Sequence, residues 1–335
     1  MRIGNFDVAS RVLIVAEVGN NHEGDPALAE AMIHAAAHAG ADAVKFQTIV
    51  PEELVSADQT ARLEQLRRFA LSRETFVRLA ETAAEAGVMF LSTAFDPDSL
   101  DFLDGLVPAH KIASGDNTFH PLLARAAATG KPILLSTGLA DRETLLAARR
   151  TIASVWEAQG RAGELALLHC VTCYPTPPGD ANLAAIAGLR ALCPTVGYSD
   201  HTLGIEAAVL SVAAGARIIE KHFTLDKGRT TFRDHQLSAD PDELAQRVRR
   251  GREAETLMGD GLGRPACEDP AAVAVRRSVA AKADLAPGTV LAPGHLRWVR
   301  PGGGVAPGRE DLLLGRRLVR AVAAGERILP ADVEA

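Results

Sequence analysis

Aromatic residues, cysteines and long apolar runs are all scarce in this sequence. Phe, Trp and Tyr make up 4% of the 335 residues, and there are only four cysteines. So few cysteines in so long a chain do not form a disulfide framework, and we expect a reducing, cytoplasmic location. No apolar run approaches the ~20 residues that span a bilayer, and the apolar stretch near the start is too short for a secretion signal. We therefore expect no membrane partner.

Positive charge is also in the minority. Lys and Arg number 36 against 42 Asp and Glu, which gives a net charge of −6. A nucleic-acid-binding protein needs a basic face that neutralises phosphates, so this balance argues against a nucleic-acid partner. With 47% apolar and 23% charged residues, the chain can bury a sizeable core. Its length predicts about two domains of roughly 150 residues, or one large barrel.

Short apolar runs alternate with Ala-rich segments of helical period over most of the chain. Several helical segments end in Gly, as helix C-caps commonly do. Continuous apolar strands that alternate with helices indicate a parallel sheet covered on both faces. This α/β pattern predicts a (β/α)8 TIM barrel. The eight expected strands lie in the runs 12–19, 43–48, 89–95, 110–115, 132–138, 165–172, 195–201 and 217–224.

Each of these runs is apolar at its start and polar at its end. Active sites of TIM barrels lie at the C-terminal ends of the strands, so the polar residues there are candidate site residues. Ser and Thr at strand ends are alternatively ordinary helix caps and turn formers. The presence of Lys, Glu and His at the same ends favours a functional site.

The composition changes after the last expected helix of the barrel. We divide the chain into a catalytic barrel over 1–262, a linker over 263–277 and a small β domain over 278–335. Within the β domain, residues 283–296 and 321–333 share a pattern of a turn Gly, an apolar pair and a Pro-containing turn. This repeat predicts two pseudo-symmetric halves. A domain of roughly 55 residues has a thin core, so we expect it to dock on something larger.

Two histidines stand at the ends of consecutive expected strands. His201 follows Ser199 and Asp200, and His222 follows Lys221. Neighbouring strand ends bring the two imidazoles to one rim, where they are suited to share a divalent ion such as Mn²⁺. Two protein ligands leave coordination positions open to water or substrate oxygen, as a Lewis-acid site requires. The alternative is a pair of hydrogen-bonded core histidines.

Two lysines, Lys45 and Lys111, also lie in the polar parts of these strands. An inward-facing lysine is costly to bury and usually has an anionic partner. Together with nearby hydroxyl groups the lysines would surround a phosphate or carboxylate. The alternative is a structural salt bridge to Glu17 or Asp116.

Ten motifs, in order along nearly the whole chain, resemble those of the sialic acid synthase (N-acetylneuraminate synthase) family, which includes legionaminate and pseudaminate synthases. They are AEVGNNHEG (16–24), KFQT (45–48), FLSTAF (90–95), HKIASGD (110–116), ILLSTG (133–138), LLHCVTCYPTP (167–177), GYSDHTLG (197–204), IIEKHFT (218–224), DHQLS (234–238) and WVRPGGG (298–304). The resemblance implies a TIM barrel followed by an antifreeze-like SAF domain of β-clip type. It also implies a domain-swapped homodimer, in which this domain caps the partner's barrel.

The resemblance further implies the reaction. Members of the family condense phosphoenolpyruvate with an N-acylated amino sugar and release phosphate by C–O cleavage. The default acceptor is N-acetylmannosamine, which gives N-acetylneuraminate. The expected cofactor is a divalent metal, Mn²⁺ by preference, with Mg²⁺ or Co²⁺ as alternatives. The expected partners are therefore phosphoenolpyruvate, an amino sugar and a second copy of the chain.

Residue by residue, the resemblance assigns four groups of site residues. The metal ligands are His201 and His222. The catalytic group is Glu17, as the acid/base candidate, with His201, His222 and Asp234. The phosphoenolpyruvate group is Lys45, Thr93, Lys111, Ser114, Ser136, Thr172 and Ser199. The sugar-facing group is Gln47, Asp116, Tyr174, Asp234 and Arg300, the last of these reaching over from the partner subunit.

The sequence departs from the family pattern on the sugar side. Asp116 stands in place of the usual Glu, and Thr172 in place of Asn or Ser. The loop 49–61 is short, and residues 230–235 replace a Pro-Gly-Pro-Asp-His motif and add the positive charge of Arg233. A synthase with a diacetamido-hexose acceptor, giving legionaminate or pseudaminate, or with another acceptor, therefore remains the alternative. A non-catalytic scaffold would be expected to have lost the histidines and lysines, and all of them are present.

Overall fold

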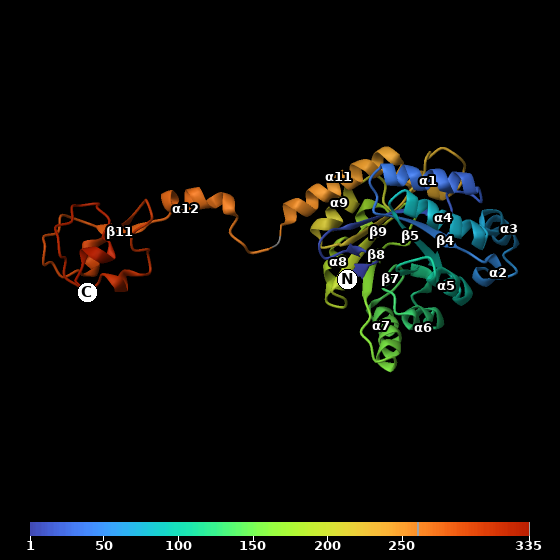
Figure 1. Ribbon diagram of the computed structural model, residues 1–335, viewed down its shortest axis with the longest axis horizontal. Helices are drawn as coiled ribbons and strands as arrows, with labels where there is room; N and C mark the ends of the chain where they lie inside the picture. The colour runs from blue at the N-terminus through green and yellow to red at the C-terminus, as the bar shows by residue number, and fades with distance from the viewer. Residues whose placement is uncertain (260, 335) are drawn as a thin grey trace. The chain divides into compact units, whose positions relative to one another are not determined.

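The chain forms two compact units, Met1–Gly259 and Asp260–Ala335 (Figure 1). The structure is a computed structural model, and it describes residues 1–259 and 261–334. Among these residues, none of the helices is both long and apolar enough to cross a membrane.

The first unit is a closed barrel of parallel strands in the order β10-β3-β4-β5-β6-β7-β8-β9. Each strand except the closing pair follows its sequence neighbour, as short right-handed βα crossovers require. The predicted (β/α)8 barrel is confirmed, and so are its eight strand positions. The strands are β3 (Leu13–Gly19), β4 (Ala43–Thr48), β5 (Met89–Ala94), β6 (His110–Ile112), β7 (Ile133–Ser136), β8 (Leu165–Cys170), β9 (Thr195–Asp200) and β10 (Ile218–His222).

Helices follow the strands and lie on the outside of the barrel (Figure 1). Acidic or hydroxyl side chains accept hydrogen bonds from the first free backbone N–H groups of several of them, as Asp25 does for α1 and Ser72 for α4. The helices are α1 (Pro26–His38), α2 (Pro51–Leu54), α3 (Thr60–Phe69), α4 (Arg73–Glu85), α5 (Pro97–Asp104), α6 (His120–Thr129), α7 (Arg142–Ala158), α8 (Ala184–Arg190), α9 (Glu206–Ala213), α10 (Arg233–Leu237) and α11 (Pro241–Met258).

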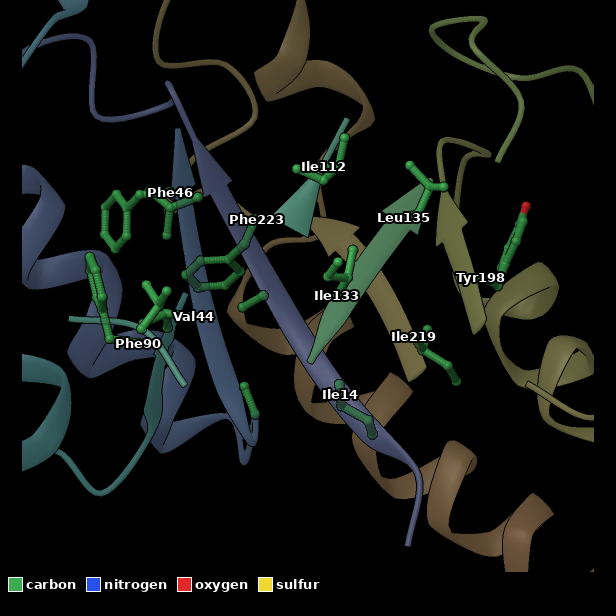
Figure 2. Close-up of a cluster of buried hydrophobic side chains, with 14 of the residues drawn as sticks. Ile14, Val44, Phe46, Phe90, Ile112, Ile133, Leu135, Tyr198, Ile219 and Phe223 are labelled. Atoms are coloured by element: carbon green, nitrogen blue, oxygen red, sulfur yellow. The ribbon is translucent and has the colours of Figure 1, made fainter. Parts of the chain in front are cut away.

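The main core lies between the strands and this layer of helices. Alternate residues of each strand point outward into it, because successive side chains of a strand face opposite sides. Phe46 of β4 and Phe90 of β5 stack there with ring centroids 5.6 Å apart, and Ile219 of β10 belongs to the same cluster (Figure 2). The Ala-rich helices allow close approach to the strands, which accounts for a large core with few aromatic rings.

The other face of the strands fills the barrel, and its character changes along the axis. At the N-terminal end the interior is apolar, with Leu13, Val15, Leu91 and Leu134 all buried. The hairpin of β1 (Arg2–Ile3) and β2 (Phe6–Asp7) belongs to this end, because Ile3 packs in the same cluster. Toward the C-terminal end the inward positions become charged or hydroxylated, and this change places the polar site at that end of the barrel.

The second unit is built from short strands and turns. Its helix α12 (Asp269–Val275) is followed by β11 (Ser278–Ala281), which pairs antiparallel with β12 (Leu296–Val299). Helix α12 falls within the range expected to be a linker, since the Gly and Pro residues around it hid a short helical segment. The expected repeat is visible in two matching 3₁₀ turns, η4 (Pro293–His295) and η6 (Pro330–Asp332). A small apolar core holds this unit together, formed by Val279, Ala281, Leu285, Leu291, Leu296, Val305, Leu313, Leu318, Val322, Ile328 and Val333.

Candidate active site

A cavity of about 270 Å³ opens at the C-terminal ends of the barrel strands. Most of the residues that the motifs assigned to metal, phosphoenolpyruvate and sugar line it. Asp116 is outside this lining, and Arg300 belongs to the second unit. The assigned residues in the lining are Glu17, Lys45, Gln47, Thr93, Lys111, Ser114, Ser136, Thr172, Tyr174, Ser199, His201, His222 and Asp234.

Lys45 lies at the floor of the cavity, and its ammonium group has three polar partners. Its Nζ is 2.7 Å from Glu17 Oε2 and 3.7 Å from Glu220 Oε2, and it donates a hydrogen bond of 2.9 Å to the hydroxyl of Thr93. All of these side chains are buried. The salt bridge that the sequence left open as an alternative is therefore present, together with a second carboxylate that the sequence reasoning did not single out.

That second carboxylate, Glu220, joins the two lysines. Its Oε1 is 3.9 Å from Lys111 Nζ and accepts a hydrogen bond of 2.9 Å from Ser199. Lys111 also donates to the hydroxyl of Ser136 at 2.7 Å. The floor of the cavity is thus a buried network of two cations and two anions. Glu220 could have been found from strand periodicity alone, because it lies two residues before His222 and so shares its face.

Burial and charge give the two carboxyl groups different proton affinities. Burial raises the pKa of Glu17 to about 7, although Lys45 opposes the shift. Burial also acts to raise the pKa of Glu220, but Lys111 and Lys45 together lower it to about 2. Near neutral pH, Glu17 is therefore the carboxyl that can hold or release a proton, while Glu220 stays ionised.

The two histidines face each other across the rim, with ring centroids 5.5 Å apart. His201 Nδ1 lies 2.9 Å from the carbonyl oxygen of Val171. Only a protonated Nδ1 can donate to a carbonyl, so the lone pair of Nε2 is left free, which is the arrangement typical of metal-binding histidines. Burial holds the pKa of His222 well below its usual value, so this ring is neutral, and among the described residues its buried Nδ1 has no hydrogen-bond partner.

These observations fit a divalent metal. Both rings line the same cavity, and His222 is neutral. Burial acts to lower the pKa of His201, but its contacts with Cys170 and Val171 raise it overall, so an ion bound there would compete with a proton. No group of three or more His, Cys, Asp or Glu residues within 1–259 and 261–334 is arranged to hold an ion. A metal at this position would therefore have His201 and His222 as its two protein ligands, and its other ligands would come from water or substrate.

The cavity lining also includes Gln47, Tyr174 and Asp234, which the motifs assigned to the sugar. The ring of Tyr174 lies 4.1 Å from that of His201, and the guanidinium of Arg233 lies 4.6 Å above the Tyr174 ring. Gln47 donates to Glu17 Oε1 at 3.1 Å and accepts from Asn20 at 2.9 Å. Asn20 was not predicted, since a side chain in the loop after a strand gives no periodic signal.

A buried ion cluster outside the barrel holds the segment that carries His201. Asp200 and Lys221 point away from the cavity, and Lys221 Nζ lies 3.3 Å from Asp200 Oδ2. Arg247 of α11 reaches the same oxygen at 3.1 Å and donates to the carbonyl of Gly204 at 2.9 Å. The backbone N–H of Thr202 donates to the other oxygen of Asp200 at 2.8 Å.

We expect Arg247→Met to lower the free energy of unfolding by about 3 kcal/mol, because removing one partner of a buried ion pair leaves the other uncompensated. Urea unfolding followed by circular dichroism measures the change. The matched control is Arg250→Met on the same helix, whose Arg is 42% exposed and 3.8 Å from Glu206. The control should cost less than about 0.5 kcal/mol. Equal losses in the two variants would show that the cluster does not stabilise the barrel.

Comparison with known proteins decides the family. A profile of the NeuB family matches residues 32–263, and a profile of the SAF domain matches residues 276–334. The chain belongs to the NeuB family. It is therefore an enzyme of the type that condenses phosphoenolpyruvate to make nonulosonic acids, and the resemblance drawn from its motifs is confirmed. The barrel followed by a SAF domain is confirmed as well.

Similar proteins match most of the chain. A protein of Methanocaldococcus jannaschii, MJ1065, is 42% identical over 91% of this chain and 89% of its own length. The N,N'-diacetyllegionaminic acid synthase of Legionella pneumophila is 38% identical over 96% and 94%, and the pseudaminic acid synthase of Campylobacter jejuni 81-176 is 34% identical over 99% of both chains. A crystal structure of the N-acetylneuraminic acid synthetase of Leptospira borgpetersenii, 35% identical, covers 81% of this chain and 94% of its own with a TM-score of 0.76.

Proposed function

We propose that this NeuB-family enzyme condenses phosphoenolpyruvate with an amino sugar that carries two acetamido groups, giving a legionaminate-type acid and phosphate. One observation carries the proposal: the buried lysines, Lys45 and Lys111, line the same cavity as the two histidines, His201 and His222. The cavity can thus hold an anion beside the side chains that would bind the metal. The similarity to N,N'-diacetyllegionaminic acid synthase supports the choice of acceptor.

The outer lining of the cavity also supports a diacetamido acceptor. Apolar side chains of Ile49, Leu54, Phe95 and Phe232 lie there among the polar groups. Burying the methyl groups of two acetamido substituents against such surfaces removes apolar area from water and would favour binding. N-acetylmannosamine, the acceptor that the motifs favour, is the second candidate, and the similarity to the Leptospira synthetase favours it.

At the floor, we assign the phosphoenolpyruvate anion to the lysines and the hydroxyl groups around them. Lys111 already donates to Ser136 and to the carbonyl of Ile112, so one of its three N–H groups is free for a ligand. Charge-assisted hydrogen bonds of this kind are shorter and stronger than neutral ones. The remaining members of this group are Lys45, Thr93, Ser114, Thr172 and Ser199.

At the rim, His201 and His222 would hold the divalent metal, Mn²⁺ by preference, with Mg²⁺ or Co²⁺ as alternatives. A metal bound there supplies Lewis-acid polarisation of the acceptor aldehyde. Glu17 lies on the strand beside His222 and contacts Lys45, and its carboxyl group can take or return a proton during the condensation. Asp234 and Gln47 would orient the sugar hydroxyls, and the buried position of the floor limits the entry of water.

A panel of acceptors tests the proposed function. The purified protein would be incubated with phosphoenolpyruvate and Mn²⁺ plus N-acetylmannosamine or a diacetamido-hexose, and phosphate release would be followed. We expect release that depends on the acceptor and is at least about tenfold faster, in kcat/KM, with the diacetamido sugar. Faster turnover of N-acetylmannosamine would overturn the choice of acceptor. Tight binding of phosphoenolpyruvate without phosphate release for any acceptor would overturn the synthase function.

We further propose that two copies of the chain complete each other's sites, with Arg300 of one copy reaching the sugar bound in the other barrel. Arg300→Ala and Asp234→Ala should each lose most activity as homodimers. Refolding the two variants together should restore up to about a quarter of wild-type turnover, because one site in a mixed dimer would hold both native residues. No recovery in mixed dimers, as judged by the same phosphate assay, would place Arg300 on its own barrel.

A further inference from the structure

A cavity of about 390 Å³, which we call the basal cavity, lies at the opposite end of the barrel from the active site. Leu165 and Thr195, the first residues of β8 and β9, line it. Cys170 and Ser199, near the other ends of the same two strands, line the active-site cavity. The two linings share none of the described residues, so the basal cavity is separate from the active site.

One wall of the basal cavity is a face of α7. Arg149, Ile152, Ala153 and Trp156 follow one another at intervals of three, one and three residues, which places them on the same side of the helix. The volume lies within the range of small-molecule sites, roughly 300–1,000 Å³. Further apolar side chains in the lining are those of Leu165, Leu192 and Pro194. The basal cavity therefore suits a small ligand with an apolar body.

Trp156 gives this lining a flat surface and a polar group. A Cβ at Gly163 would overlap the indole ring, so the ring can pack there only because residue 163 is a glycine. The indole Nε1 is buried and has no hydrogen-bond partner among the described residues. An unpaired buried donor is costly, and a ligand that carries an acceptor group would remove that cost.

Arg149 supplies a positive charge that is not neutralised by a neighbour. It is half-buried, and none of the carboxylates in the described part of the chain lies within salt-bridge distance of its guanidinium. The one carboxylate in the lining, Glu164, is engaged elsewhere. It accepts a hydrogen bond of 3.1 Å from the backbone N–H of Arg2 and lies 3.4 Å from the terminal amine of Met1. A planar guanidinium in this state suits bidentate contact with a carboxylate.

We propose that the basal cavity binds a small carboxylic acid with a flat apolar body. The carboxylate lies on Arg149, and the body packs against Trp156 and the apolar lining. The inference goes beyond the proposed function, because both substrates of the condensation are polar and bind at the other end of the barrel. An acid in the basal cavity is therefore expected to bind together with phosphoenolpyruvate and not in competition with it.

Nuclear magnetic resonance of the indole N–H groups tests the inference, because the chain has two tryptophans, Trp156 and Trp298. A ¹H–¹⁵N spectrum of the full-length protein gives one signal for each, and the variant Trp298→Phe assigns them. Benzoate and its uncharged analogue benzamide would be titrated in turn. We expect benzoate to shift the Trp156 signal in a saturable way and to bind at least about tenfold more tightly than benzamide, because its contact with Arg149 is charge-assisted. Saturating phosphoenolpyruvate should leave the affinity for benzoate unchanged.

Arg149→Met should remove most of the preference for benzoate over benzamide. The control is Arg150→Met, at the next residue of α7, which is exposed and does not line the basal cavity; it should keep the preference. Four results would overturn the inference: no saturable shift of the Trp156 signal, equal affinity for the two compounds, the same effect of both arginine variants, or displacement of benzoate by phosphoenolpyruvate. The last result would place benzoate at the lysines of the active site.

Discussion

His222→Ala is expected to lower phosphate release from phosphoenolpyruvate by at least about a thousandfold. The variant loses one of the two imidazoles at the cavity rim, and loss of a Lewis acid costs several kcal/mol of transition-state stabilisation, where each 1.36 kcal/mol is a factor of ten in rate. Because His222 lies at the end of β10, its removal leaves the apolar end of the barrel intact. Steady-state turnover and Mn²⁺ affinity, both measured on the purified variant, check the prediction.

The matched control is His34→Ala, in the exposed part of α1. It should keep wild-type turnover and metal affinity. The circular dichroism spectrum and melting temperature of His222→Ala should remain close to those of the wild type. Full activity of a folded His222→Ala variant would remove the metal assignment.

Lys111→Met is expected to raise the KM for phosphoenolpyruvate on the order of a hundredfold. The Met side chain fills a similar volume but removes the ammonium, and a hydrogen bond to a charged group contributes about 1.5–3 kcal/mol. Lys45 would keep both Glu17 and Glu220 as partners, so the floor retains two ion pairs. Initial-rate kinetics with phosphoenolpyruvate varied at saturating acceptor would measure the change.

Lys131→Met provides the comparison. Lys131 lies beside the start of β7, at the opposite end of the strand from the cavity, and its Nζ is 3.2 Å from Asp104. We expect the KM of Lys131→Met for phosphoenolpyruvate to stay within about twofold of the wild-type value. A wild-type KM in Lys111→Met would place the phosphoenolpyruvate anion elsewhere in the cavity.

The sequence predicted the barrel well because the signals involved are local. Each strand is a continuous apolar run, since both its faces are buried at the N-terminal end, and each run ends in polar residues that reach the cavity. The alternation of side chains along a strand also shows why two polar neighbours of the histidines are not part of the cavity. Asp200 and Lys221 are neighbours of the histidines in sequence, but successive residues face opposite sides, so they point outward to Arg247.

Other features depend on which segments meet in space. Arg62 of α3 and Arg233 of α10 line one cavity although they are far apart in the chain. No periodic pattern reports such a meeting, because it depends on the packing of Phe69 against Phe232. The role expected for Arg300 is similar, since it depends on a second copy of the chain. Asp116, which the motifs assigned to the sugar, lies outside the cavity lining. Its carboxyl group is partly buried there, and burial raises its pKa to about 6.

The origin of the released phosphate oxygen tests the central claim most directly. Phosphoenolpyruvate labelled with ¹⁸O at the bridging position would be incubated with the enzyme, Mn²⁺ and the preferred acceptor, and the products would be weighed by mass spectrometry. Condensation with C–O cleavage predicts acceptor-dependent release of phosphate that carries the label, together with a product three carbons longer than the acceptor. Phosphate without the label, or release that does not depend on the acceptor, would contradict a phosphoenolpyruvate-condensing synthase.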